Sequence, residues 1–71
     1  MNLDKIRIIV NGKGREIGDS TNVSNLLDDL GLNHERVVIE LNEKILAKEL
    51  FSATALTTGD SVEIIQFVPG G

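Results

Sequence analysis

The residues of this chain with the clearest chemical potential are the last four, Val68-Pro69-Gly70-Gly71, which follow a β-rich segment. Glycine has no side chain and the widest conformational freedom, so two consecutive glycines form a thin and adaptable strip of backbone. When extended, four residues span roughly 13 Å, at about 3.3–3.6 Å each. Such a strip could deliver the Gly71 carboxylate through a narrow channel of another protein. A carboxylate becomes an acyl electrophile only after it is coupled to a good leaving group, and this chain offers no evident group for that activation.

An inert tail is the alternative interpretation of these residues, because many chains end in small residues that have no function. Pro69 cannot donate a ladder hydrogen bond and therefore closes the preceding strand. The direct succession of strand, proline and two glycines favours a functional tail. We therefore expect a folded domain over residues 1–67 and a tail over residues 68–71, with Gly70 and Gly71 as its working end.

Other chemical sites are not favoured by the sequence. The chain has no Cys and a single His, His34, so no nucleophilic triad and no metal site built from several His or Cys ligands can be assembled. Three glycines, at positions 12, 14 and 18, are spaced too loosely for a dinucleotide-binding loop. Asp60 follows Gly59 and predicts a turn rather than a catalytic acid. Asp28 and Asp29 are expected on a solvated helix face, with a basic patch of a partner as the alternative.

Composition limits the function classes further. A chain of 71 residues forms one domain with a modest core, which leaves little room for a deep substrate pocket. Eleven acidic residues against seven basic ones give a net charge of -4, which argues against nucleic acids and anionic membranes as partners. The lack of Cys, of a signal peptide and of a long apolar run predicts a cytoplasmic protein.

Hydrophobic periodicity predicts an α+β fold. Val23, Leu26, Leu27 and Leu30 share one face of a helix that Asp19 to Asn22 would cap and Gly31 would end. Alternating patterns predict strands over about 6–10, 15–17, 37–41, 45–46 and 61–67, with tight turns at residues 11–12 and 42–43. Residues 50–56 are expected to be irregular, with one helical or 3₁₀ turn. We expect a mixed sheet of four to five strands with one main helix on one face.

The last predicted strand places its side chains on two faces. Val62 and Ile64 would point to one face, and Glu63, Ile65 and Phe67 to the other. If the helix covers the first face, Ile65 and Phe67 are at least partly exposed just before Val68 and Pro69, where an apolar pair could dock on a partner. The alternative is that the pair packs under residues 50–56 or against Ile9.

Four segments, in their order and spacing, resemble the ubiquitin-like β-grasp sulfur carriers of the ThiS type. The resemblance covers residues 6–71. It is carried by Val10-Asn11-Gly12, by the helix from Val23 to Leu30, by Leu41-Asn42-Glu43-Lys44-Ile45, and by Gly59-Asp60 before a strand that leads to Gly70-Gly71.

This resemblance implies a function as a carrier rather than an enzyme. An E1-like adenylating enzyme (ThiF/MoeB type) would use ATP to adenylate Gly71, and a sulfur donor supplied by a cysteine desulfurase would convert the adenylate to a thiocarboxylate. Thiazole synthase (ThiG type) would receive the sulfur for the thiazole ring of thiamine. The carrier itself would bind no cofactor and no metal.

Three alternatives to the thiamine carrier are left open. The small subunit of molybdopterin synthase shares the fold, the Gly-Gly end and the thiocarboxylate, but those chains tend to be longer. A ubiquitin-like protein modifier would join Gly71 to a lysine. A plain binding module would have an inert tail.

Overall fold

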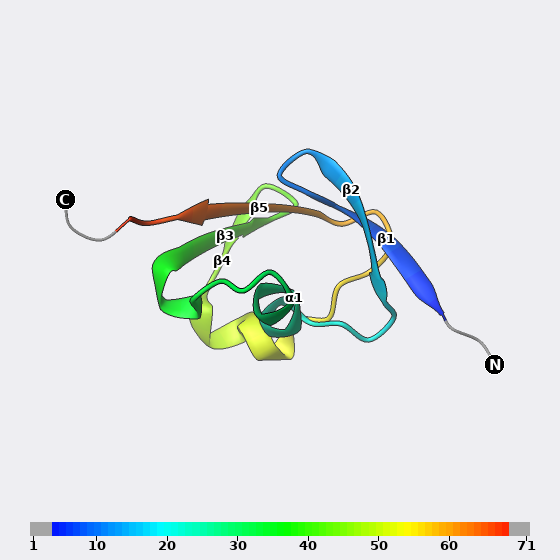
Figure 1. Ribbon diagram of the computed structural model, residues 1–71, viewed down its shortest axis with the longest axis horizontal. Coiled ribbons are helices and arrows are strands. Elements are labelled where there is room, and N and C mark those ends of the chain that lie inside the picture. The colour runs from blue at the N-terminus through cyan, green and yellow to red at the C-terminus, as the bar shows by residue number, and fades with distance from the viewer. Residues whose placement is uncertain (1–3, 69–71) are drawn as a thin grey trace.

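The structure is a computed structural model that describes residues 4–68 of the chain (Figure 1). Five strands, one α-helix and two 3₁₀ helices follow one another in the described residues. In chain order they are β1 (Lys5–Val10), β2 (Lys13–Gly18), α1 (Val23–Asp29), η1 (His34–Arg36), β3 (Val37–Leu41), β4 (Lys44–Leu46), η2 (Lys48–Ala53) and β5 (Ser61–Gln66). The predicted α+β class is confirmed, and the 3₁₀ turn expected within residues 50–56 is the second half of η2.

The five strands form one mixed sheet in the order β2-β1-β5-β3-β4. The last strand of the chain, β5, lies at its centre, parallel to β1 and antiparallel to β3. The strand that leads toward the end of the chain therefore lies in the middle of the sheet. Figure 1 shows the end of β5 at the opposite side of the molecule from the start of β1.

Two tight turns connect the antiparallel hairpins, as the sequence predicts. Asn11 and Gly12 have φ angles of 51° and 83°, and Asn42 and Glu43 have φ angles of 53° and 72°. Positive φ at both central residues defines a two-residue turn of type I′, whose twist matches that of the flanking strands. The β1–β2 ladder therefore starts beside the turn, where Val10 pairs with Lys13, and β2 is longer than predicted.

Helix α1 begins at a capping box. Asn22 Oδ1 accepts a hydrogen bond from Asn25 N at 2.7 Å, and Asn25 Oδ1 accepts one from Asn22 N at 3.1 Å, so the first turn satisfies its own free donors. The helix ends with Leu30 as C-cap, followed by Gly31 at a φ of 71°. The helix predicted from hydrophobic spacing is thus confirmed to within one residue.

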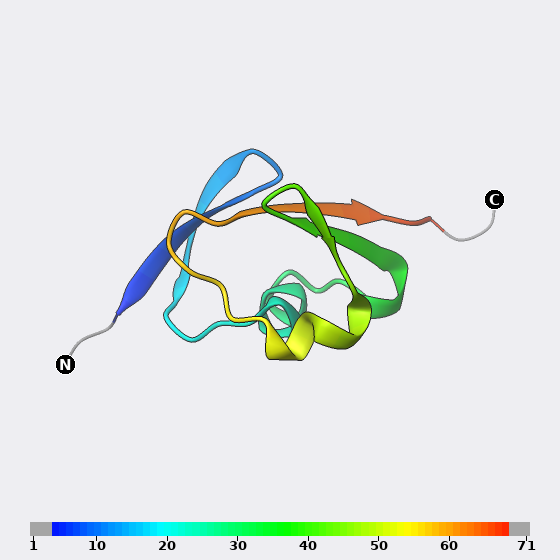
Figure 2. The same cartoon turned by 180° about the vertical axis from the view of Figure 1, so that it is seen from behind.

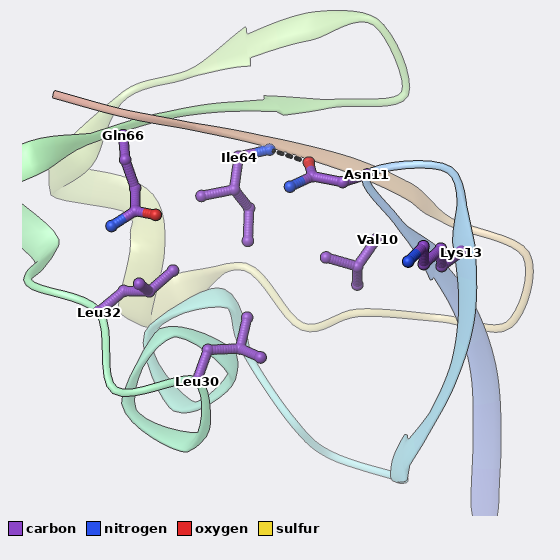
Figure 3. Close-up of a pocket in the computed structure, with 7 residues that line it drawn as sticks. All are labelled: Val10, Asn11, Lys13, Leu30, Leu32, Ile64 and Gln66. Atoms are coloured by element: carbon purple, nitrogen blue, oxygen red, sulfur yellow. Dashed lines mark hydrogen bonds between the residues drawn. The ribbon is translucent and has the colours of Figure 1, made fainter.

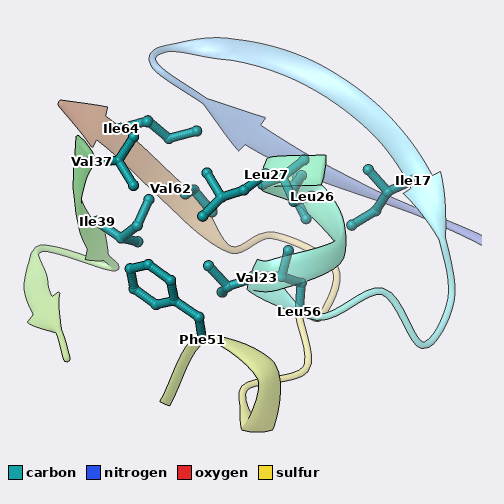
Figure 4. Packing of buried hydrophobic residues seen from close by; sticks show 11 residues of the cluster. Ile17, Val23, Leu26, Leu27, Val37, Ile39, Phe51, Leu56, Val62 and Ile64 are labelled. Carbon is teal, nitrogen blue, oxygen red and sulfur yellow. The ribbon is translucent and has the colours of Figure 1, made fainter. Parts of the chain in front are cut away.

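The hydrophobic core lies between α1, η2 and the face of the sheet that they cover, which we call the inner face (Figures 1, 2 and 4). Phe51 of η2 is 3% exposed and points into this core. Alternate residues of the three central strands supply the opposing side. The buried hydrophobic residues are Ile8, Ile17, Val23, Leu26, Leu27, Val37, Ile39, Phe51, Leu56, Val62 and Ile64.

Candidate functional site

The predicted reactive end, Gly70 and Gly71, lies outside the described residues together with Pro69. What the structure describes is the strand that leads to it. Strand β5 pairs with β3 from Val62 to Gln66, and the ladder continues as Phe67 N donates to Arg36 O at 2.8 Å. The backbone is therefore fixed by hydrogen bonds up to two residues before Pro69.

Asn11 provides a second connection to β5, at the point where β1 turns away from it. Its backbone N donates to Val62 O at 2.9 Å, and its side-chain Oδ1 accepts a hydrogen bond from Ile64 N at 2.7 Å (Figure 3). In a parallel ladder the second bond would go to the backbone carbonyl of the same residue. The Asn11 side chain replaces that carbonyl and continues the connection of β1 with β5 as far as Ile64. From the sequence, Asn11 is predicted only as a turn residue.

The face of the sheet away from α1, which we call the outer face, is not covered by a helix in the described part of the chain (Figure 2). Ile65 is 47% exposed and Phe67 54% exposed on this face, and Val68 just beyond them is 87% exposed. The predicted exposure of the pair is confirmed. One of the two alternatives, burial under residues 50–56, is wrong, because that segment lies against the inner face and sends Phe51 into the core.

Further apolar side chains share the outer face. Ile9 of β1 is 41% exposed and Ile45 of β4 is 71% exposed. Ile45 pairs with Glu40 of β3, which in turn pairs with Glu63 of β5, so all three lie on this face. An uncovered apolar surface of this kind is typical of a protein-binding site.

A pocket of about 390 Å³ opens on the inner side, next to the end of α1 (Figure 3). Its lining is mostly apolar and includes no carboxylate, His or Cys. The lining residues are Val10, Asn11, Lys13, Leu30, Leu32, Ile64 and Gln66. The pocket therefore offers space but no evident acid, base or nucleophile.

The remaining polar candidates have structural roles. His34 Nε2 lies 2.9 Å from Asp28 Oδ1, and its ring meets Phe51 edge-on at a centroid distance of 6.4 Å, so it joins η1 to α1 and to the core. Asp60 Oδ2 accepts a hydrogen bond from Thr57 N at 2.9 Å, which confirms the predicted turn role. No group of three or more potential metal ligands occurs within residues 4–68.

One surface ion pair changes the pKa of Glu35. Lys48 Nζ lies 2.9 Å from Glu35 Oε1, and this hydrogen bond, together with the charge of Lys48, lowers the pKa of Glu35 below 4.5. The pair joins η1 to η2 on the side of the molecule away from the outer face.

Among the described helices, none is long and apolar enough to span a membrane.

Comparison with known proteins agrees with this geometry. The sequence profile of the ThiS family matches residues 4–71. The crystal structure of a thiamine biosynthesis protein (ThiS) from Geobacter metallireducens is 39% identical, with a TM-score of 0.79, over 93% of this chain and 100% of that one. The sulfur carrier protein ThiS of Bacillus subtilis is 34% identical over 53 residues, which are 75% of this chain and 80% of that protein.

A longer relative contains a segment that is similar to nearly all of this chain. The thiazole synthase of Paramagnetospirillum magneticum is 33% identical over 66 residues, which are 93% of this chain but 20% of that protein. The chain thus spans about a fifth of the length of that relative. With a family match over nearly all of its length and the fold of a ThiS structure, the chain belongs to the ThiS family of sulfur carrier proteins.

Proposed function

We propose that this protein carries sulfur for thiamine biosynthesis as a thiocarboxylate on Gly71. In the first step the Gly71 carboxylate attacks the α-phosphorus of ATP, pyrophosphate leaves, and an acyl-adenylate forms. In the second step hydrosulfide, released from a persulfide by two thiols that become a disulfide, attacks the carbonyl carbon; a C–S bond forms, the C–O bond to AMP breaks, and AMP leaves. Both steps occur in a partner enzyme of the ThiF/MoeB type, and the sulfur comes from a cysteine desulfurase.

The observation that carries this proposal is the course of β5. The strand is fixed at the centre of the sheet up to Phe67, and the two glycines follow in the sequence after Val68 and Pro69. A rigid platform with a short thin extension can present a carboxylate at a defined distance from its own surface. Neither the described residues nor the tail supply an activating group, so the protein acts as a cosubstrate that partner enzymes load and unload.

We propose thiazole synthase (ThiG type) as the acceptor of the sulfur. In the relative from Paramagnetospirillum magneticum, a segment similar to this chain belongs to the same polypeptide as a thiazole synthase. Joining two domains in one chain keeps them at high effective concentration, which is useful when one must deliver a group to the other. We expect this chemistry in the cytoplasm, where a Cys-free chain meets reduced sulfur donors.

The exposed end of β5 is the proposed docking site for these enzymes. Ile65 and Phe67 present apolar surface on the outer face, and Val68 and Pro69 lead from it to the glycines. An enzyme that acts on Gly71 sits within roughly 13 Å of Phe67, since four extended residues span no more. Its surface therefore meets these side chains first.

The test of this proposal is the intact mass of the protein after incubation with a ThiF-type enzyme, ATP and sodium sulfide. We expect a gain equal to the mass difference between sulfur and oxygen, located to Gly71 by fragmentation and reversed on hydrolysis. A chain that lacks Gly71 is the matched control and gains nothing. An unchanged mass of the full chain, with the enzyme active on a known ThiS protein, contradicts the proposal.

A further inference from the structure

Two glutamates face each other at the centre of the outer face. Glu40 of β3 is the direct partner of Glu63 of β5 in the antiparallel register. The residues two positions on, Asn42 and Ser61, are joined by a backbone hydrogen bond of 2.8 Å, so Glu40 and Glu63 also form a hydrogen-bonded pair. Their Cα atoms are then about 5.5 Å apart, and like charges at such positions destabilise a sheet.

The fold provides no cation to neutralise this pair within the described residues. The two ion pairs there, His34 with Asp28 and Lys48 with Glu35, lie elsewhere. Arg7 of β1 shares the outer face, but it lies toward β2. A Cβ atom placed on Gly14 would be 2.7 Å from Arg7 Nη2, so the guanidinium covers that glycine.

Apolar residues lie beside the two glutamates on β4 and on one side along β3 and β5, and the polar pair of Asn42 and Ser61 lies on the other side. Ile45 is the partner of Glu40 on β4, and the neighbouring pair along β3 and β5 is Val38 with Ile65. A protein that covers Ile65 and Phe67 also removes water from Glu40 and Glu63. Burying two carboxylates in such an interface is unfavourable unless the partner supplies a positive charge and hydrogen-bond donors.

We propose that the outer face binds the enzyme that activates Gly71 through an arginine of that enzyme, seated between Glu40 and Glu63 among the apolar side chains. This inference rests on the proposed carrier function and names the chemistry of its docking site. An arginine fits better than a lysine, because its planar guanidinium carries five donors and can bridge two carboxylates while stacking on apolar surface. The net charge of -4 supports the same polarity of attraction at longer range.

The proposed binding role of Glu40 and Glu63 can be distinguished from a structural role. Like charges directly opposite each other are unfavourable in a sheet, so neutralising Glu40 and Glu63 is not expected to destabilise the free protein. In the complex they hold the arginine, so their neutralisation weakens binding. Replacing both glutamates is therefore expected to keep or improve stability while it impairs docking, whereas replacing a residue needed for the fold lowers both.

The test compares two variants that each lose two negative charges. Glu40→Gln/Glu63→Gln removes the facing pair, and Asp29→Asn/Glu49→Gln removes two exposed charges of α1 and η2. For each we measure the melting temperature and the KM of the carrier in loading by a ThiF-type enzyme with ATP and sulfide, at low and high salt. For the facing-pair variant we expect an unchanged or higher melting temperature, an unchanged kcat, a KM raised about tenfold and a weaker dependence on salt. The control variant keeps its KM within about twofold.

Other results overturn the inference in distinguishable ways. An equal KM for the facing-pair variant and the wild type, or an equal rise in both variants, shows that no cation is seated between Glu40 and Glu63 and leaves the carrier function intact. Failure of the wild-type chain to be loaded removes the proposed function and this inference together.

Discussion

The two faces of β5 differ in what their side chains do, although the residues alternate along one strand. On the inner face Val62 is 0% and Ile64 9% exposed, and both belong to the core. On the outer face Ile65 and Phe67 are about half exposed, and Glu63 faces a like charge. The inner residues therefore hold the strand in place, and the outer ones are available to a partner.

This contrast shows how a small domain combines a stable platform with a recognition surface. With few residues to bury, the chain completes its core on one side only. The opposite side then tolerates features that cost stability, such as the Glu40–Glu63 pair and the uncovered apolar side chains. Such features persist in proteins mainly where function uses them.

The largest expected effect compares neighbouring residues of the same type. Ile64→Ala removes core packing and should reduce the free energy of unfolding by about 2–4 kcal/mol. Ile65→Ala on the outer face should reduce it by less than about 1 kcal/mol. Chemical denaturation of both variants measures the difference, and equal losses would contradict the assignment of the two faces.

A second prediction concerns the connection that Asn11 makes to β5. Asn11→Gly preserves the positive φ but leaves Ile64 N without its acceptor, so the free energy of unfolding should fall by about 1–3 kcal/mol. Asn11→Asp retains an acceptor oxygen and tolerates the same backbone conformation, and it should lose less. If the two variants unfold at the same denaturant concentration, the side-chain bond to Ile64 contributes nothing.

A third prediction concerns docking through the apolar side chains of the outer face. Ile65→Ala/Phe67→Ala should raise the KM for loading of Gly71 about tenfold, which corresponds to about 1.4 kcal/mol, with kcat unchanged. Leu50→Ala is the control, because Leu50 is 49% exposed but lies on η2, away from the outer face. A similar rise in KM for the control would show that docking is not confined to the outer face.

The smallest expected effect is the pH dependence of the Glu35–Lys48 pair. Because the folded pKa of Glu35 is lowered, the pair's contribution is present above about pH 4.5 and is lost as the pH falls through the folded pKa. Glu35→Gln should therefore show a slightly smaller loss of melting temperature than the wild type between about pH 6 and pH 3. The pair is exposed, so the difference should shrink in high salt. Identical pH profiles would show that the pair contributes no measurable stability.

Much of the fold was predictable because local patterns specify it. The spacing of Val23, Leu26 and Leu27 predicts α1, and the dipeptides Asn11-Gly12 and Asn42-Glu43 predict tight turns that the positive φ angles confirm. The parallel pairing of β1 with β5 joins residues about 50 positions apart, and no local pattern encodes it.

The outer face was predictable only in part. Alternation along residues 61–67 correctly placed Ile65 and Phe67 opposite the core. The facing of Glu40 and Glu63 depends on the register between β3 and β5, and the role of Asn11 depends on the place where β1 leaves β5. Both are tertiary relationships. The sequence alone identifies Asn11 only as a turn residue, and it does not set Glu40 and Glu63 apart from the other acidic residues.

The most direct test of the account follows a sulfur atom from the carrier to its product. The protein is loaded with heavy-isotope sulfide, purified, and incubated with a thiazole synthase and the other substrates of that enzyme. We predict that the label leaves Gly71 and appears in the thiazole, with the carrier returned to its unlabelled carboxylate mass. Retention of the label on Gly71 by a synthase that accepts sulfur from a known ThiS protein would contradict the assignment to thiamine biosynthesis.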